Sequence, residues 1–304
     1  MNQANILTNG KIVLLLALAT CALWGSVYPA VKIGFEMFAI TDAPSKILFA
    51  GYRFTFAGIV LLPFLKATGV KPFSFSAGNF LSFVILGFMI TTVELVFFYI
   101  GLSNTSAAKA SVLGSGTFFC VLVAHFAYTD DRINRRTAAG LCLGLVGLVA
   151  VNIDRGFDLS FRFTGEGFML LSALSFALGS VYGKTLSRTV NPALMTAWQM
   201  ITGGLILVIA GLAFGGSMAA PTAASATLFA YLVLMSSVSY TLYSLLLKYN
   251  PVSRISIYNF TTPIFGTLLS GVFLGDDIFQ IWHVIALGCV CTGIWLVNSN
   301  KRLG

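Results

Sequence analysis

A single carboxylate, that of Glu94, lies inside a long apolar stretch of the chain. A charged side chain at the centre of a lone helix in hydrocarbon costs roughly 2.5–3.5 kcal/mol, so such residues face a protein interior or a wet cavity. This cost leaves two kinds of role open. Glu94 is either a binding-site counterion and ion-coupling carboxylate, or a structural partner of Arg53 on another helix.

Tyrosine and tryptophan residues recur in the same apolar stretches. Aromatic faces around a carboxylate form a box for an ammonium group through cation–π attraction, although aromatic residues of membrane helices also lie at the lipid interface. We predict a substrate-binding set that combines both residue types. The set is Glu94, Trp24, Tyr28, Tyr99, Tyr182, Tyr240, Tyr243 and Tyr258.

Arg53 is a charged residue within the second apolar stretch. An arginine there either clamps a substrate carboxylate or ties helices together through backbone carbonyl groups. In the later segment that aligns with this one, the neutral Gln199 is equivalent to Arg53, which favours a structural role for both. We also expect a structural role for Pro263, which interrupts an apolar stretch.

The sequence contains none of the residue patterns that would indicate an enzyme. His125 and His283 are isolated, and there is no phosphate-binding loop and no G-x-S-x-G segment. We therefore expect no catalytic residues, no metal site and no cofactor. Without an ATP-binding motif, any active transport would depend on an ion or solute gradient.

Composition indicates an integral membrane protein. Of the 304 residues 57% are hydrophobic and 9% are charged, and the mean hydropathy is +0.90. Soluble proteins carry roughly 25% charged residues, so this chain cannot cover its surface with polar groups. The net charge of +8 is spread over many short loops, which is typical of membrane topology signals. The expected partners are a lipid bilayer and a small-molecule substrate, with no nucleic acid.

Apolar stretches of about 20 residues, long enough to cross roughly 30 Å of hydrocarbon as helices, predict an all-α polytopic protein with ten transmembrane helices. The first five are Ile12–Phe38, Ile47–Leu65, Asn79–Leu102, Thr105–Tyr128 and Ala138–Asn152. The second five are Gly165–Leu186, Pro192–Phe214, Leu228–Tyr249, Val252–Leu274 and Phe279–Asn298.

An internal repeat organises these ten spans. Thr91–Ser111 recurs as Ser236–Ser256, 145 positions later, and Tyr52–Gly58 aligns with Trp198–Gly204 at a displacement of 146. We predict a first five-helix repeat in residues 1–155 and a second in residues 156–304, within one compact transmembrane domain. Because five is odd, the second copy must be inverted in the membrane, which is characteristic of carriers.

The distribution of basic residues predicts the orientation. Most loop lysines and arginines fall on the same side as both chain ends, and such loops lie in the cytoplasm. We therefore expect a multi-pass protein of the cell inner (plasma) membrane with both termini cytoplasmic. Glycines such as Gly140, Gly144 and Gly147 indicate close helix packing, either within a monomer or across a homodimer.

Landmarks in both halves together resemble a known family. They are Trp24-Gly25, Tyr52-Arg53-Phe54, Gly101–Lys109, Gln199, Asn250–Arg254, Pro263 and Leu274–Asp276. This pattern, which covers nearly the whole chain, resembles the EamA-type branch of the drug/metabolite transporter superfamily. The family commonly has a proline midway along the fourth span, where this chain has Gly114–Phe119.

The resemblance implies ten helices, alternating access and a central cavity lined mainly by the first, third, fourth, sixth, eighth and ninth spans. We therefore predict a secondary transporter that moves a small metabolite, coupled to protons or ions, with the two halves rocking about a midplane site. Candidate substrates are an amino acid or derivative, or a cationic or amphipathic compound such as a quaternary ammonium. An uncoupled facilitator or channel and a non-catalytic membrane scaffold remain the alternatives.

Overall fold

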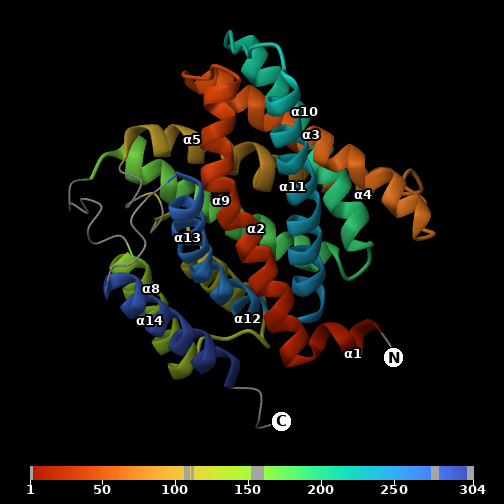
Figure 1. The fold of residues 1–304 in the computed structure, drawn as a ribbon. Helices are drawn as coiled ribbons and strands as arrows, with labels where there is room; N and C mark the ends of the chain where they lie inside the picture. The colour runs from red at the N-terminus through yellow and green to blue at the C-terminus, as the bar shows by residue number, and fades with distance from the viewer. Residues whose placement is uncertain (1–2, 106–109, 111–112, 152–160, 275–280, 300–304) are drawn as a thin grey trace.

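The computed structural model describes residues 3–105, 110, 113–151, 161–274 and 281–299. All regular secondary structure in these ranges is helical (Figure 1), which confirms the all-α class. Several predicted features lie partly or wholly outside the described residues. They include the end of the Gly101–Lys109 landmark, Asp276, parts of the fourth, fifth and tenth predicted spans, and the boundary between the predicted repeats at residues 155–156.

The helices coincide closely with the apolar stretches of the sequence. The α-helices are α1 Gln3–Thr8, α2 Gly10–Met37, α3 Ala43–Ala67, α4 Ala77–Gly87, α5 Glu94–Asn104, α7 Thr117–Ala127, α8 Arg135–Val151, α9 Phe168–Leu186, α10 Pro192–Ala213, α11 Ala223–Tyr249, α12 Val252–Ser256, α13 Thr262–Leu274 and α14 Ile281–Asn298. Two π-helical turns, η1 Phe88–Val93 and η3 Phe163–Gly167, and the 3₁₀ turn η4 Ile257–Thr261 connect some of them.

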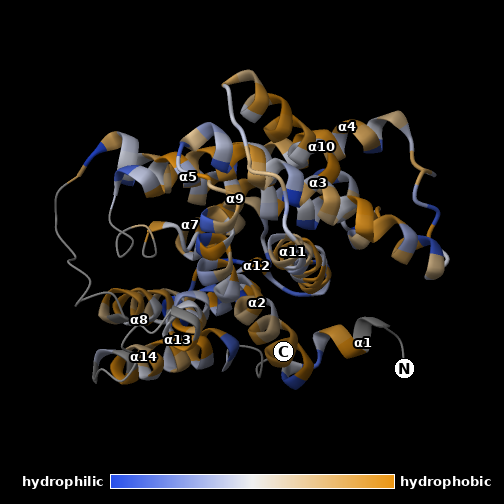
Figure 2. Ribbon diagram, turned by 45° about the horizontal axis from the view of Figure 1, so that its top comes forward, coloured by the Kyte–Doolittle hydropathy of each residue, from blue (hydrophilic) through white to orange (hydrophobic). Residues whose placement is uncertain are grey.

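Six helical stretches in the described residues are long and apolar enough to cross a membrane. They are Gly10–Met37, Ala43–Ala67, Ala77–Asn104, Phe163–Leu186, Pro192–Ala213 and Ala223–Tyr249. The apolar helices Thr117–Ala127 and Val284–Asn298 are shorter. Figure 2 shows hydrophobic residues along the helices and hydrophilic ones mainly at helix ends and in loops, as a lipid-facing bundle requires.

Polar side chains begin several of these helices. Asp42 precedes α3 and accepts hydrogen bonds from the Ser45 backbone N–H and hydroxyl, each at 2.8 Å. These bonds lower the pKa of Asp42, and the bond from the Ser45 backbone N–H has the larger effect. The negative charge of Asp42 also lies favourably at the positive end of the helix dipole. Thr222 and Ser225 form a reciprocal capping box at the start of α11, which satisfies two free backbone donors.

Two predicted spans are interrupted rather than continuous. The fourth, expected over Thr105–Tyr128, has a turn at Gly114 and Ser115, and α7 starts only after Gly116, whose φ is +65°. Glycine adopts this left-handed conformation without steric cost. The ninth is divided by the 3₁₀ turn η4 between α12 and α13. Glycine breaks the helix in the first case, and a segment preceding Pro263 breaks it in the second.

Glycines allow α3 and α10 to pack backbone against backbone. A Cβ atom added at Gly51 would lie 2.6 Å from the backbone nitrogen of Val208, and one at Gly58 would lie 2.4 Å from the carbonyl oxygen of Ala197. In the same way, a Cβ atom at Gly140 of α8 would lie 2.8 Å from the Gly293 carbonyl oxygen of α14. Small residues at helix interfaces produce this close approach in membranes.

Replacing Gly58 with alanine is expected to destabilise the protein, because the added methyl group would overlap a backbone atom that cannot move independently. Overpacking of this kind costs about 1–3 kcal/mol, which should lower the thermal unfolding midpoint of the detergent-purified protein. Gly288→Ala is the matched control, since nothing lies within 4 Å of that position. An unchanged midpoint for Gly58→Ala would show that the two helices are not in close contact.

Candidate functional site

A cavity of about 510 Å³, called here the central cavity, lies between helices from both halves of the chain. Its walls come from α2, α3, α5, α9, α11, the turn before α7 and the segment around η4. Apolar and aromatic side chains predominate in the lining, as is usual for small-molecule sites. The charged side chains among the described lining residues are Lys32, Lys46, Arg53 and Glu94.

The central cavity extends to one end of the bundle. Lys32 lies near the end of α2, Lys46 near the start of α3 and Leu102 near the end of α5, and all three line the cavity. The start of α2 and the short helix α1 lie at the opposite end of the molecule (Figure 1). The cavity therefore leads from the middle of the bundle to the end where α2 finishes.

Hydrogen bonds hold the helices together at the opposite end. The Tyr128 hydroxyl donates to the Val181 carbonyl oxygen at 2.8 Å, which connects the end of α7 to α9. The Ser253 backbone N–H donates to Asp131 Oδ2 at 3.1 Å, and the Ser253 hydroxyl donates to the same carboxylate. Both contacts join the first half of the chain to the second. They hold the two halves together at the end of the bundle that the cavity does not reach.

Glu94 is the first residue of α5, directly after the π-helical turn η1. The Met89 carbonyl oxygen accepts a hydrogen bond from the Glu94 backbone N–H, five residues later, and another from the Ser175 hydroxyl at 2.8 Å. Such π-turns frequently occur at functional sites. The Glu94 carboxylate lines the cavity, and its Oε2 atom is buried without a hydrogen-bond partner among the described residues.

Arg53 lies on α3 and also lines the central cavity, although most of its side chain is buried. Its Nε donates to the Ser236 hydroxyl at 2.9 Å and its Nη2 to the Met235 sulfur at 3.4 Å. Arg53 and Glu94 do not form an ion pair, which would require an N···O distance of 4.0 Å or less. The two opposite charges therefore face one cavity without neutralising each other directly.

Four of the predicted aromatic residues line the central cavity with Glu94. They are Trp24 and Tyr28 on α2, Tyr99 on α5 and Tyr240 on α11. The ring centroids of Trp24 and Tyr240 are 5.6 Å apart in an edge-on arrangement. Contact of these residues with a substrate stays a prediction, but they surround the same space as the carboxylate.

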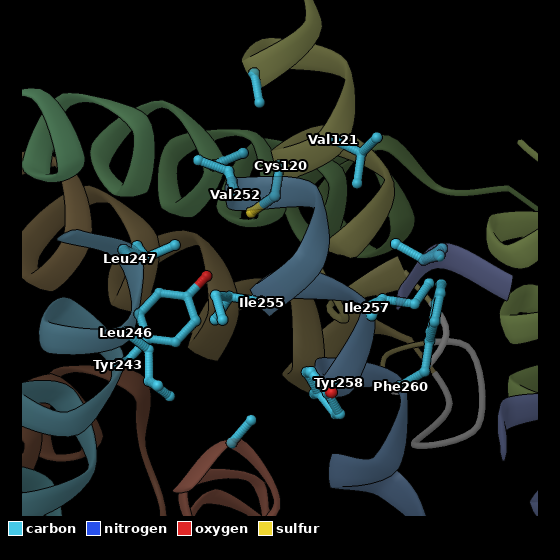
Figure 3. Close-up of a cluster of buried hydrophobic side chains, with 14 of the residues drawn as sticks. Cys120, Val121, Tyr243, Leu246, Leu247, Val252, Ile255, Ile257, Tyr258 and Phe260 are labelled. Carbon is cyan, nitrogen blue, oxygen red and sulfur yellow. The ribbon is translucent and has the colours of Figure 1, made fainter. Parts of the chain in front are cut away.

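The other three predicted aromatic residues are not among those that line the cavity. Tyr243 lies behind the wall, 5.0 Å from Trp24 between ring centroids, and belongs with Tyr258 to a buried hydrophobic cluster (Figure 3). In that view the Tyr243 hydroxyl points toward the side on which Cys120 lies. Tyr182 packs against a different apolar cluster, between α3, α4 and α10.

The two remaining residues with predicted structural roles occupy different positions. Gln199 is buried in α10, and its carbonyl oxygen lies 2.4 Å from where a Cβ atom on Gly87 would be. Pro263 is the second residue of α13, directly after η4, and lines the cavity. Proline is tolerated in the first turn because the backbone N–H that it lacks would have no partner there.

The sequence analysis did not single out two polar lining residues, Asn259 and Thr262. Their side-chain oxygens, like the Trp24 indole nitrogen, are buried without a hydrogen-bond partner among the described residues. Buried polar atoms normally have a hydrogen-bond partner, so a ligand or water in the cavity would supply the missing hydrogen bonds. Their position just before Pro263 within an apolar span was the available signal. Phe54 and Phe176 also line the cavity, but the sequence contained no signal for them, because nothing distinguishes them from the other residues among its 27 phenylalanines.

Comparison with known proteins shows that the chain is similar to membrane transporters. The chain is 27% identical over 292 residues to the "Uncharacterized inner membrane transporter YedA" of Escherichia coli (strain K12), covering 92% of this chain and 89% of that protein. It is 27% identical over 285 residues to a chloroplastic WAT1-related protein of Arabidopsis thaliana, covering 90% of this chain and 66% of the plant protein's length.

A solved structure and a family model also match this chain. A crystal structure with 17% sequence identity superposes with a TM-score of 0.81, covering 96% of this chain and 98% of the other, which supports the fold alone. Residues 11–153 and residues 163–299 each match the EamA-like transporter family. Together these matches cover nearly the whole chain, and the protein belongs to the EamA-like transporter family.

Proposed function

We propose that the protein is a secondary transporter that moves a small metabolite across the cell inner membrane by alternating access. The observation that carries this proposal is the central cavity, which reaches one end of the bundle and contains a buried carboxylate oxygen without a partner among the described residues. Hydrogen bonds between Tyr128 and Val181 and between Asp131 and Ser253 hold the two halves together at the other end. A site open to one side only is the arrangement that a carrier needs.

Inverted repeats over residues 1–155 and 156–304 are part of this proposal. The α3–α10 contact supports them, since Ala197 and Gly204 follow Gly51 and Gly58 by 146 positions. A Cβ atom at Gly51 would lie 3.0 Å from the Gly204 carbonyl oxygen, and one at Gly58 would lie 2.4 Å from that of Ala197. Such reciprocal contacts between equivalent positions are the mark of a two-fold relationship.

The α8–α14 contact repeats the same pattern. Ala286 and Gly293 follow Gly140 and Gly147 by 146 positions. A Cβ atom at Gly140 would lie 2.8 Å from the Gly293 carbonyl oxygen, and one at Gly147 would lie 2.9 Å from that of Ala286. The match of each half to the same family is further support. An odd number of spans in each half then inverts the second copy, giving ten spans in all.

Both chain ends are proposed to lie in the cytoplasm. The Asn250 side-chain amide donates to the Leu7 carbonyl oxygen at 2.9 Å, and Arg254 Nε donates to Asn298 Oδ1 at 3.0 Å. These bonds hold both ends of the described chain at the start of α12, and therefore at one end of the bundle. An even number of membrane crossings would place both chain ends on the same side of the membrane. The basic loops on that side favour the cytoplasm.

Replacing Glu94 with glutamine should abolish transport of the solutes that the wild-type protein carries, or remove its dependence on pH. The change keeps the shape of the side chain and removes the negative charge from the cavity. Uptake of radiolabelled amino acids, amines and quaternary ammonium compounds into proteoliposomes, with and without a proton gradient, measures the effect. We expect at least a tenfold lower initial rate, which corresponds to about 1.4 kcal/mol.

Glu36→Gln is the matched control, since Glu36 is exposed near the end of α2 and is not among the lining residues. Wild-type rates and pH dependence in Glu94→Gln would rule out the proposed role of this carboxylate. Flux that does not saturate and needs no gradient would favour the alternative of an uncoupled facilitator, and absence of flux for every solute would favour a scaffold.

The proposed topology can be tested separately from transport. A green fluorescent protein fused after Gly304 should fluoresce, and alkaline phosphatase fused at the same place should be inactive, because the first matures in the cytoplasm and the second outside it. Cellular fluorescence and phosphatase activity, normalised to the amount of fusion protein, provide the measurement. The opposite pair of results would place the C-terminus outside and contradict the proposed orientation.

A further inference from the structure

The charges that line the central cavity are mostly positive. Lys32, Lys46 and Arg53 are basic and Glu94 is the acidic residue among the described lining residues. Like charges repel, and the repulsion is strong where apolar walls exclude water. A ligand whose only charge is positive therefore meets more repulsion than attraction on its way to Glu94. A negative group on the same ligand would reverse that balance.

Arg53 has unused capacity to bind an anion. A guanidinium group carries five N–H donors, and the described residues accept two hydrogen bonds from Arg53, one at the Ser236 hydroxyl and one at the Met235 sulfur. Neither acceptor is charged, and a thioether is a weak acceptor. A buried cation is strongly stabilised by a carboxylate that accepts two parallel hydrogen bonds. No carboxylate of the described residues pairs with Arg53.

Arg53 and Glu94 carry opposite charges and line the same cavity, yet they are too far apart for an ion pair. Both residues line the same space, with Tyr99 and Tyr240 beside them in the lining. A molecule that lies between them can pair with each at once. The gap between two opposite charges is the geometry that suits a ligand with two opposite charges of its own.

We infer that Arg53 binds the carboxylate of the transported molecule while Glu94 binds its cationic group, so that the substrate is a small zwitterion. This inference rests on the proposed transport function and narrows its substrate class. It assigns Arg53 a specificity-determining role in addition to its contacts with α11. It also disfavours simple quaternary ammonium ions such as choline, because they lack the group that Arg53 would pair with.

Binding to the purified full-length protein tests the inference. The twenty proteinogenic L-amino acids and glycine betaine are screened by thermal shift. The tightest amino acid is then compared by calorimetry with its decarboxylated amine and its deaminated acid, and glycine betaine with choline. We expect each zwitterion to bind on the order of 10- to 100-fold more tightly than its partner without a carboxylate, the range typical of a charged hydrogen-bonded pair.

Arg53→Gln should remove this preference, so that the zwitterion and its matched amine bind with similar affinity. A merely structural role for Arg53 would weaken both ligands alike and leave their ratio unchanged. Arg53→Lys keeps the positive charge but lacks the planar guanidinium group, so it should retain part of the preference for the zwitterion. If Arg53→Gln does not fold, Arg53→Lys is used for the test instead. Lys66→Gln is the matched control, since Lys66 is exposed at the end of the same helix.

Three results would overturn the inference: no zwitterion binds, matched amines bind as tightly as zwitterions, or the ratio is unchanged in the Arg53 variants. Its failure can be told apart from failure of the transport proposal. Proteoliposome uptake of an amine or choline that depends on Glu94, without uptake of any zwitterion, would contradict the inference and leave the transport proposal standing. Absence of uptake for every compound would contradict both.

Discussion

Hydrocarbon offers no hydrogen bonds, so a helix within a membrane can be interrupted only where its backbone groups find partners in protein or in a wet cavity. The interruptions near the centre of this bundle obey that constraint. Glu94 follows the π-helical turn η1, Gly114 and Ser115 form the turn before α7, and Asn259 lies in η4, and all of them line the central cavity. The cavity and the broken helices therefore depend on each other, because the breaks expose polar groups and the cavity makes that exposure tolerable.

The polar groups of the site are held by packing around them. Thr92 donates from η1 to the Gly203 carbonyl oxygen of α10 at 3.1 Å, and Ser175 donates from α9 to Met89 at 2.8 Å. These bonds fix the irregular turn from two sides, and so fix the position at which Glu94 enters the cavity. Since Gly203 itself leaves no room for a side chain at the contact, the position of the Glu94 carboxylate depends on a glycine that lies far from it in the sequence.

The positions of the helices could be predicted well from the sequence, whereas their irregular turns could not. Long apolar runs are sufficient to locate α2 or α10, but η1 depends on Ser175 and Gly203, which are far from it in the chain. Glu94 and Trp24 could be assigned to the cavity because a carboxylate must avoid lipid and α2 was expected to line the site. Tyr182, Tyr243 and Tyr258 were chosen by residue type and because they lie on spans expected to line the cavity. Helices that are apolar on every side do not reveal which face meets the cavity.

The glycine contacts also determine which parts of the protein can move together. α3 belongs to the amino-terminal half of the chain and α10 to the carboxy-terminal half, yet their backbones leave no room for one methyl group at Gly58. The same holds for α8 and α14 at Gly140. Helices packed this closely cannot separate or slide past each other without losing these backbone contacts. Each of these tightly packed pairs takes one helix from the amino-terminal half and one from the carboxy-terminal half, so any movement that separated the two halves would first have to break these backbone contacts.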